Sequence, residues 1–331
     1  MIPHRDILER ITDILARSKD VLILEHEKPD GDSIGSGLAL ALALSSLGKK
    51  ALLLSQDPHP SMYDFLPGRH LYTMVSCLGP EDADPDVTVF LDCTGPERAG
   101  KALEYAHSET WINIDHHISN SGFGHVSLVD PDAAATGELV FFLLKAMGVE
   151  IDEDMATCLY VAIVTDTGGF RYQNTGPRCF HVAAELIDKG VNPSFVADLL
   201  YETRSLSSLM LLKNALQALE VYKNGRLATI DVTKAMLEDA GASFEDADSI
   251  VNYPRSIAGV EVALCFKESP DQTAVHLSLR SRSKVDVSEI AGLLGGGGHS
   301  RAAGAVVQGS LEQVKARVLG VLDGLDIWAD S

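Results

Sequence analysis

The sequence predicts an α/β protein with an N-terminal parallel sheet, helices on both faces of that sheet, and a smaller C-terminal α/β domain. Short runs rich in Val, Ile and Leu recur in the first half of the chain, each followed by polar or glycine residues, at 21–24, 51–54, 87–91 and 111–114. Buried parallel strands have this pattern. The 331 residues also exceed what one hydrophobic core usually covers, so two domains are expected.

Helical segments are expected between and after these strands. Residues 33–47 start polar, continue with small and apolar side chains, and are followed by Gly48, which matches the start and stop signals of a helix. Two further apolar segments, 137–147 and 153–165, have helical character, and Thr136 can cap the first of them. An α/β layer structure follows for the first domain.

The pattern changes near Asn192, where a helical stretch without strands begins and continues to residue 219. We therefore expect a first domain, a helical linker and a second domain at 1–192, 193–220 and 221–331. In the second domain, Asn224-Gly225 between two apolar runs is the strongest short-range signal of a hairpin. Two more strands and a helix are expected at 260–266, 273–279 and 287–294.

Composition restricts the partners of the chain. A net charge of −20 disfavours a protein that wraps long nucleic acid, because such binding depends on many Lys and Arg contacts to phosphates. The longest strongly apolar stretch, 38–44, is far shorter than the roughly 20 residues of a membrane-crossing helix. The N-terminus lacks the features of a secretion signal, so we expect a cytoplasmic protein without a membrane partner.

Carboxylates and imidazoles recur where the predicted elements end. His26, Asp30 and Asp32 lie between the first strand and its helix, at the edge where open α/β sheets bind ligands. Asp92 and the run Asp115-His116-His117 directly follow two other strands, and Asp166 interrupts an apolar segment before two glycines. Each alone is explained equally well by a loop or a cap. Their joint occurrence on four segments indicates a site for Mn²⁺ or Mg²⁺, which prefer such ligands.

These residues, in this order and spacing, resemble the four motifs of the DHH phosphoesterases. Residues 295–304, GGGGHSRAAG, are similar to the signature of the DHH-associated C-terminal domain, so the resemblance covers nearly the whole chain. Residues 168–175 resemble the nanoRNase branch of the family. Members of that branch degrade very short oligonucleotides, and several also remove phosphate from 3′-phosphoadenosine 5′-phosphate (pAp) or cleave cyclic-dinucleotide products.

The resemblance implies two divalent metal ions, Mn²⁺ in the first place with Mg²⁺ or Co²⁺ as alternatives, in an active-site cleft between the domains. One ion would be held by His26, Asp30 and Asp92, and the other by Asp32, Asp92, His116 and Asp166. His117 would face the scissile phosphate, and Asp115 would fix an imidazole from behind. The second domain would bind the substrate through Arg280, Ser281, Gly297, Gly298 and His299.

The leading interpretation is a metal-dependent phosphodiesterase and exoribonuclease that hydrolyses very short RNA or DNA oligonucleotides to mononucleotides, and pAp to AMP. A phosphodiesterase for cyclic or linear dinucleotides such as pApA or pGpG and a manganese pyrophosphatase are the alternatives among enzymes. A nucleotide sensor without turnover is disfavoured by the complete ligand set. For the glycine run alone, a flexible connector is the competing reading. The sequence does not decide whether the protein forms a homodimer. Histidines such as His59, which lack partners at meaningful spacing, are interpreted as ordinary polar residues.

Overall fold

The computed structural model describes residues 3–79 and 83–325, which divide into two compact units. Unit 1 extends to Glu202, and unit 2 begins at Thr203. The segment 193–220, predicted as a linker, is shared: α6 (Pro193–Ala197) and a π-helical turn (Asp198–Glu202) belong to unit 1, and α7 (Leu206–Leu216) belongs to unit 2. The predicted cleft between the domains stays a prediction. None of the helices within the described ranges combines the length and apolarity needed to cross a membrane.

Unit 2 contains a six-stranded mixed sheet with the order β11-β12-β10-β9-β8-β7. Only β8 and β9 are parallel among its paired strands within the described ranges. Its strands are β7 (Glu220–Tyr222), β8 (Leu227–Val232), β9 (Val262–Glu268), β10 (Ala274–Ser281), β11 (Gly297–His299) and β12 (Ala302–Gln308). Its helices besides α7 are α8 (Lys234–Ala240), α9 (Asn252–Ser256), α10 (Val287–Leu293) and α11 (Leu311–Asp323).

Two local predictions in this part of the chain have opposite outcomes. The hairpin is confirmed, because β7 and β8 pair antiparallel around a turn in which Asn224 has a left-handed φ of 53°. The continuous helix predicted over 195–219 is wrong, because the chain leaves helical geometry before α7. Ser205 begins a new helix there, since its side chain accepts a hydrogen bond from the Ser208 N–H.

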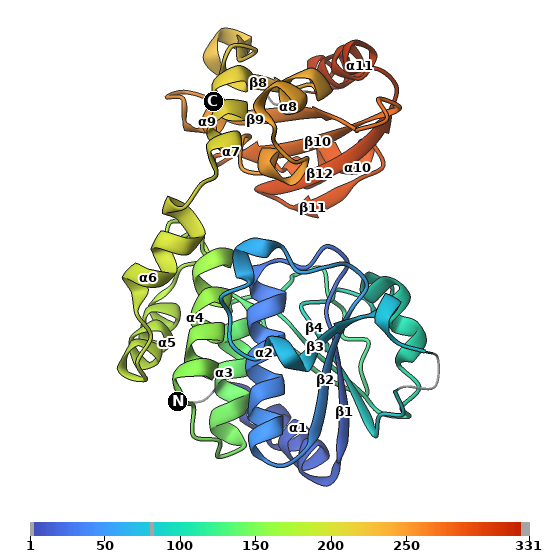
Figure 1. Cartoon of the computed structure of the whole chain (residues 1–331), viewed down its shortest axis with the longest axis vertical. Coiled ribbons are helices and arrows are strands. Elements are labelled where there is room, and N and C mark those ends of the chain that lie inside the picture. Colours follow the sequence, from blue (N-terminus) through green and yellow to red (C-terminus); the bar gives the residue numbers. More distant parts are fainter. Residues whose placement is uncertain (1–2, 80–82, 326–331) are drawn as a thin grey trace. The chain divides into compact units, whose positions relative to one another are not determined.

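Unit 1 is built on six parallel strands in the order β3-β2-β1-β4-β5-β6 (Figure 1). They are β1 (Asp20–Leu24), β2 (Lys50–Ser55), β3 (Tyr72–Met74), β4 (Val87–Leu91), β5 (Trp111–Asp115) and β6 (Val126–Val129). The chain runs outward from β1 to β3 and then returns to β4 on the other side of β1. The strand order therefore reverses between β1 and β4, and ligands of open α/β sheets bind beyond the carboxyl ends of strands at such a point.

The two faces of this sheet are covered differently. Ile23, Leu53 and Val89 point into a core shared with α1 (Arg5–Arg17), α2 (Gly31–Ser46), α3 (Thr136–Ala146), α4 (Glu153–Asp166) and α5 (Pro177–Asp188). Leu22 and Phe90 point to the opposite face, which a 3₁₀ helix (Pro96–Tyr105) covers. Shorter 3₁₀ turns occur at Ser61–Tyr63, Arg69–Leu71, Val75–Cys77, Lys223–Gly225 and Glu245–Ala247.

Close packing of α2 against α4 brings two distant motifs together. These helices lie side by side with α3 on one face of the sheet (Figure 1). A Cβ added to Gly35 would lie 2.4 Å from the backbone oxygen of Cys158 and 3.0 Å from Ala162 Cβ, so the approach requires glycine. Asp32 near the start of α2 is thereby held near Asp166 at the end of α4.

We expect Gly35→Ala to destabilise unit 1 by about 1–3 kcal/mol, the usual cost of overpacking a core, because the new methyl group meets a backbone carbonyl. Urea unfolding followed by circular dichroism measures this. Gly320→Ala is the matched control, since the added methyl in α11 has open space around it and alanine favours helix. Equal stabilities of Gly35→Ala and the unmodified chain would contradict the packing argument.

Candidate metal centre

The predicted ligands converge at the carboxyl edge of the unit 1 sheet, where the strand order reverses. His26 follows β1, Asp92 follows β4 directly, and His116 follows β5 directly. The remaining ligands lie at helix ends. Three overlapping groups of side chains have ligand atoms close enough to share an ion, namely His26, Asp30 and Asp92; Asp32, His116 and Asp166; and Asp92, His116 and His117.

The separations between ligand atoms fit shared ions better than hydrogen bonds. His26 Nε2 lies 3.5 Å from Asp92 Oδ2 and 3.8 Å from Asp30 Oδ1. His116 Nε2 lies 3.6 Å from Asp166 Oδ2, 3.7 Å from Asp92 Oδ1 and 3.8 Å from Asp32 Oδ2. Hydrogen bonds are shorter, whereas two ligands that are each about 2.0–2.2 Å from one ion are separated by about this much. We name the first set subsite A and the second set subsite B.

Asp92 belongs to both subsites, with one carboxylate oxygen for each. Its Oδ2 faces His26, and its Oδ1 faces His116. The residue has a left-handed φ of 58°, which L-residues rarely adopt, and its backbone N–H continues the β-ladder to the Ile114 carbonyl. Strained backbone of this kind persists where the surroundings enforce it, often at functional sites. The turn after β4 thus directs the carboxylate between the two histidines.

Main-chain carbonyls orient the histidines of both subsites. The ring nitrogen His26 Nδ1 lies 2.8 Å from the Glu27 carbonyl oxygen, and His116 Nδ1 lies 3.3 Å from the Ala133 carbonyl oxygen. A carbonyl only accepts hydrogen bonds, so each Nδ1 carries the hydrogen. Each Nε2 is then the atom that faces the carboxylates and would bind an ion once deprotonated, which is the arrangement of a metal-ligating histidine held by an outer partner.

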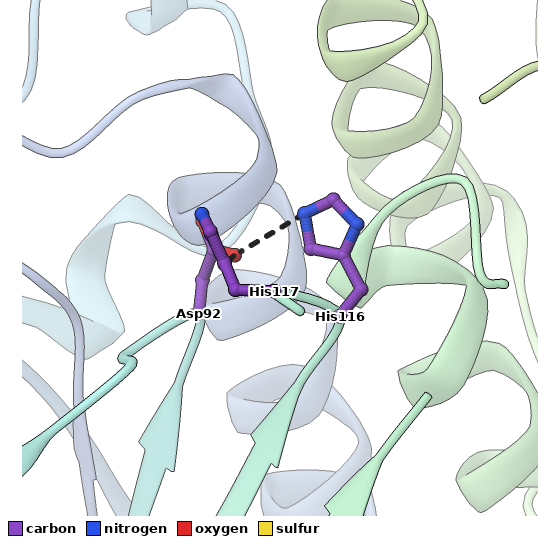
Figure 2. A group of neighbouring side chains, drawn as sticks. All are labelled: Asp92, His116 and His117. Atoms are coloured by element: carbon purple, nitrogen blue, oxygen red, sulfur yellow. Dashed lines mark ion pairs between the residues drawn. The ribbon is translucent and has the colours of Figure 1, made fainter. Parts of the chain in front are cut away.

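His117 is oriented differently from the other two histidines. Its Nδ1 lies 2.6 Å from Asp115 Oδ1 and 3.4 Å from Asp92 Oδ1. Figure 2 shows His117 beside Asp92 and His116, with the His116–Asp92 ion pair marked. Because Nδ1 donates to Asp115, it offers no lone pair to an ion, and the third group of side chains is not a further metal subsite.

The carboxylate of Asp115 is fully buried and accepts several hydrogen bonds at the carboxyl edge of the sheet. Its Oδ1 accepts hydrogen bonds from the His116 and His117 backbone N–H groups as well as from His117 Nδ1. Its Oδ2 accepts from Asn120 Nδ2 at 2.6 Å. The carboxylate is thus held on both oxygens, and its negative charge faces the imidazole of His117. This position fits the orienting role that the sequence analysis expected.

Asp30 and Asp32 are held by helix N-termini. Asp30 caps α2, because its Oδ1 accepts from the backbone N–H groups of Asp32 and Ser33, and its side chain is 57% exposed. The buried carboxylate of Asp32 accepts from the backbone N–H groups of Thr136 and Gly137 at 2.6 and 2.9 Å. The positive end of the α3 dipole favours an anion at that place. Thr136, expected as the cap of α3, is instead its first residue, following Ala135.

The charges of the cluster displace the pKa values of its members. Burial opposes the charge on His26, but hydrogen bonds to Asp30 and Asp92 outweigh it and raise the pKa to about 11. Burial likewise opposes the charge on His116, while Asp166, Asp92 and Asp32 raise its pKa to about 9. Burial raises the pKa of Asp166 to about 7. Nearby positive charge therefore stabilises the ionised carboxylates, and divalent ions supply such charge.

The substrate-binding residues predicted in unit 2 lie on β10 and β11, which both pair with β12. Gly297 and Gly298 form β11, which pairs with β12 in a hairpin. A Cβ on Gly296 or Gly298 would lie 2.1 or 2.6 Å from a carbonyl oxygen of β12, so these glycines permit the close hairpin. The competing reading of this run as a flexible connector is therefore wrong. Ser281 Oγ donates to the Ser300 carbonyl, Arg280 precedes it on β10, and the His299 side chain lies outside the described residues.

Several residues around the centre were missed by sequence reasoning. His59, interpreted as an ordinary polar residue, has its Nε2 2.6 Å from Glu25 Oε1, and both side chains are buried. Asn120 and Asn174 bind Asp115 and Asp166. His59 and Glu25 lie on distant segments, and the two asparagines follow their partners at separations that no regular element brings together, so spacing alone gave no signal for these pairs.

Comparison with known proteins places the chain among relatives over nearly its whole length. The DHH family N-terminal domain matches residues 20–163, and the DHHA1 domain matches residues 227–323. The chain is 40% identical to the bifunctional oligoribonuclease and PAP phosphatase NrnA of Thermus thermophilus, covering 90% of this chain and 88% of that protein. It is 28% identical to the NrnA of Bacillus subtilis, covering 87% and 90%.

A solved structure has the same architecture. The exopolyphosphatase-related protein of Bacteroides fragilis superposes with a TM-score of 0.89 at 28% identity, covering 96% of both chains. The α/β fold class with a parallel N-terminal sheet and a second mixed sheet is thereby confirmed. Together with the two domain matches and the Thermus relative, this likeness shows that the chain belongs to the DHH family, with a C-terminal DHHA1 domain.

Proposed function

We propose that this DHH-family phosphoesterase hydrolyses very short oligonucleotides to mononucleotides, and pAp to AMP, with two Mn²⁺ ions at subsites A and B. The observation that carries the proposal is the position of Asp92, whose two oxygens face the histidines of different subsites. Mg²⁺ and Co²⁺ are alternatives with the same ligand preferences. The names of the NrnA relatives support both substrates.

The mechanism assigns separate tasks to the residues of the centre. A bound pair of divalent ions supplies a nucleophile from water at neutral pH and charge to clamp a phosphate. Burial opposes the charge on His117, but its hydrogen bond to Asp115 outweighs burial and raises the pKa of the imidazole. We assign the protonated imidazole, which Asp115 favours, to donate through Nε2–H to the phosphate or to the leaving oxygen. Asp115 keeps the ring in that orientation.

Short substrates and a cytoplasmic location are part of the proposal. The net charge of −20 repels long polyanions, so affinity has to come from the metal centre and from a few groups in unit 2. We assign Arg280, Ser281, Gly297, Gly298 and His299 to that second task. All five cysteines are free, whereas disulfides form in oxidising compartments, which supports the cytoplasm.

His117→Ala should lower kcat by about 10²- to 10⁴-fold, the usual contribution of a general acid, and leave Mn²⁺ binding unchanged. Steady-state kinetics on a dinucleotide together with equilibrium Mn²⁺ binding measures both effects. His107→Ala, which removes an exposed histidine of the same unit, should change neither quantity. Loss of Mn²⁺ binding in His117→Ala would assign His117 to the metal rather than to the substrate.

Mn²⁺ binding should release protons. With pKa values of about 11, 9 and 7, His26 and His116 are protonated at about pH 7, and Asp166 is protonated in about half of the molecules. Ligands bind metal in their deprotonated forms, so protons compete below these raised pKa values, and Mn²⁺ affinity should increase as pH rises from about 6 to 9. Calorimetry in two buffers of different ionisation enthalpy should give different heats. Identical heats would contradict proton release.

The substrate assignment is tested by ranking kcat/KM over a dinucleotide, a pentanucleotide, a long RNA, pAp, a cyclic dinucleotide and pyrophosphate. We expect the dinucleotide, the pentanucleotide and pAp to be hydrolysed at least tenfold more efficiently than the long RNA, because repulsion grows with the number of phosphates. A cyclic dinucleotide at the top of the ranking would favour the cyclic-dinucleotide phosphodiesterase. Pyrophosphate at the top would overturn the proposal. Asp92→Asn is the inactive control.

A further inference from the structure

One short segment contacts three of the candidate ligands. Residues 133–137 lead from β6 into α3, and we call them the 133–137 segment. The Ala133 carbonyl accepts from His116, Thr136 Oγ1 donates to Asp92 Oδ1 at 3.0 Å, and the backbone N–H groups of Thr136 and Gly137 donate to Asp32. All three ligands belong to subsite B, whereas His26 and Asp30 take no part in these hydrogen bonds.

Asn174 connects the fourth ligand of subsite B to the same segment. Its Nδ2 lies 2.9 Å from the Ala134 carbonyl oxygen, 3.2 Å from the Asp166 carbonyl oxygen and 3.2 Å from Asp166 Oδ2. All three neighbours are acceptors, so the amide presents its NH₂ group to them, and its two hydrogens serve three oxygens. Asn174 thus ties the end of α4 to the segment that orients His116.

The 133–137 segment is fixed in place on its outer sides. Ala133, Ala134, Ala135 and Thr136 are buried, and a Cβ on Gly137 would lie 2.5 Å from Ala162 Cβ in α4. On the far side, the guanidinium of Arg178 in α5 pairs with both Asp130 and Glu138, which flank the segment. Buried groups with this many hydrogen bonds and ion pairs have little freedom to shift, so the segment can act as a fixed reference for the ligands.

We propose that Asn174 and Thr136 are positioning residues that set the geometry of subsite B by tying Asp166 and Asp92 to the 133–137 segment. This inference rests on the proposed two-metal function. Neither side chain is a ligand: the Asn174 amide faces acceptors, and the Thr136 hydroxyl donates to Asp92. Both act through the carboxylates they hold. Asn174 holds a ligand of subsite B alone, whereas Thr136 holds the shared Asp92 by Oδ1, the oxygen that faces subsite B.

The test uses the full chain and Mn²⁺ alone, with free Mn²⁺ measured by electron paramagnetic resonance. Asn174→Asp keeps the shape but replaces the donor by a carboxylate facing Asp166, and Thr136→Val removes the hydroxyl that holds Asp92. We expect the unmodified chain to bind two Mn²⁺ per molecule. Asn174→Asp should weaken one of the two sites by about 10- to 100-fold and leave the other site unchanged, whereas Thr136→Val, through the shared Asp92, should weaken the same site by as much and the other site less.

Kinetics separate positioning from substrate contact. For Asn174→Asp, kcat on a dinucleotide should be recovered at high Mn²⁺ with KM unchanged, because the residue acts on Asp166 and not on substrate. A KM raised by tenfold or more with both Mn²⁺ sites intact would overturn the assignment and make Asn174 a substrate contact. Asn174→Ala, which adds no charge, is the second variant and should weaken the same site.

The controls are neighbours that lack these contacts. Gln173→Ala changes an exposed residue next to Asn174, and Thr175→Val removes a hydroxyl without a hydrogen-bond partner among the described residues. Both should retain two unchanged Mn²⁺ sites. If Asn174→Asp and Thr136→Val also kept two unchanged Mn²⁺ sites, the positioning role would be overturned, but the proposed function would not. Failure of the unmodified chain to bind Mn²⁺ would instead overturn the proposed function, and this inference with it.

Discussion

The carboxylate of Asp92 faces a different histidine with each of its two oxygens, and the rest of unit 1 depends on this arrangement. Asp92 can face His26 and His116 at once only because it follows β4 at the place where the strand order reverses, with β1 on one side and β5 on the other. The left-handed backbone at Asp92 is needed for the same arrangement, since an extended residue there would continue the strand.

Charge is the second constraint, and it links folding to metal binding. Asp32, Asp92 and Asp166 share a small volume, and burial raises the pKa of Asp32 and of Asp166, which makes their simultaneous ionisation unfavourable. The N-terminus of α3 and the imidazoles supply part of the missing positive charge, and the pKa of Asp92 is held low against burial by its hydrogen bond to His26 and by the charges of His117 and His116. Divalent ions would replace the protons of those imidazoles, so the fold and the ions stabilise each other.

The sequence predicted the parts of this arrangement that depend on local pattern. Strands β1, β2, β4 and β5 were visible as apolar runs, and the ligands were visible because each lies at the end of an element. The strand β11 was missed, because its two glycines carry no strand propensity and pair only through close backbone approach. The break before α7 was missed because no glycine or proline marks it, whereas a serine cap decides it.

Contacts between side chains of distant segments could not be predicted, and they differ in how much they depend on residue type. The orientation of His26 and His116 comes from main-chain carbonyls, which any residue at Glu27 or Ala133 would supply. The position of Asp166 comes from the side chain of Asn174, and that of Asp92 partly from Thr136, so these two constraints are lost by a single substitution. In this fold, main-chain groups therefore largely set the orientation of the metal ligands. A few side chains that are not themselves ligands set the spacing of the carboxylates in subsite B.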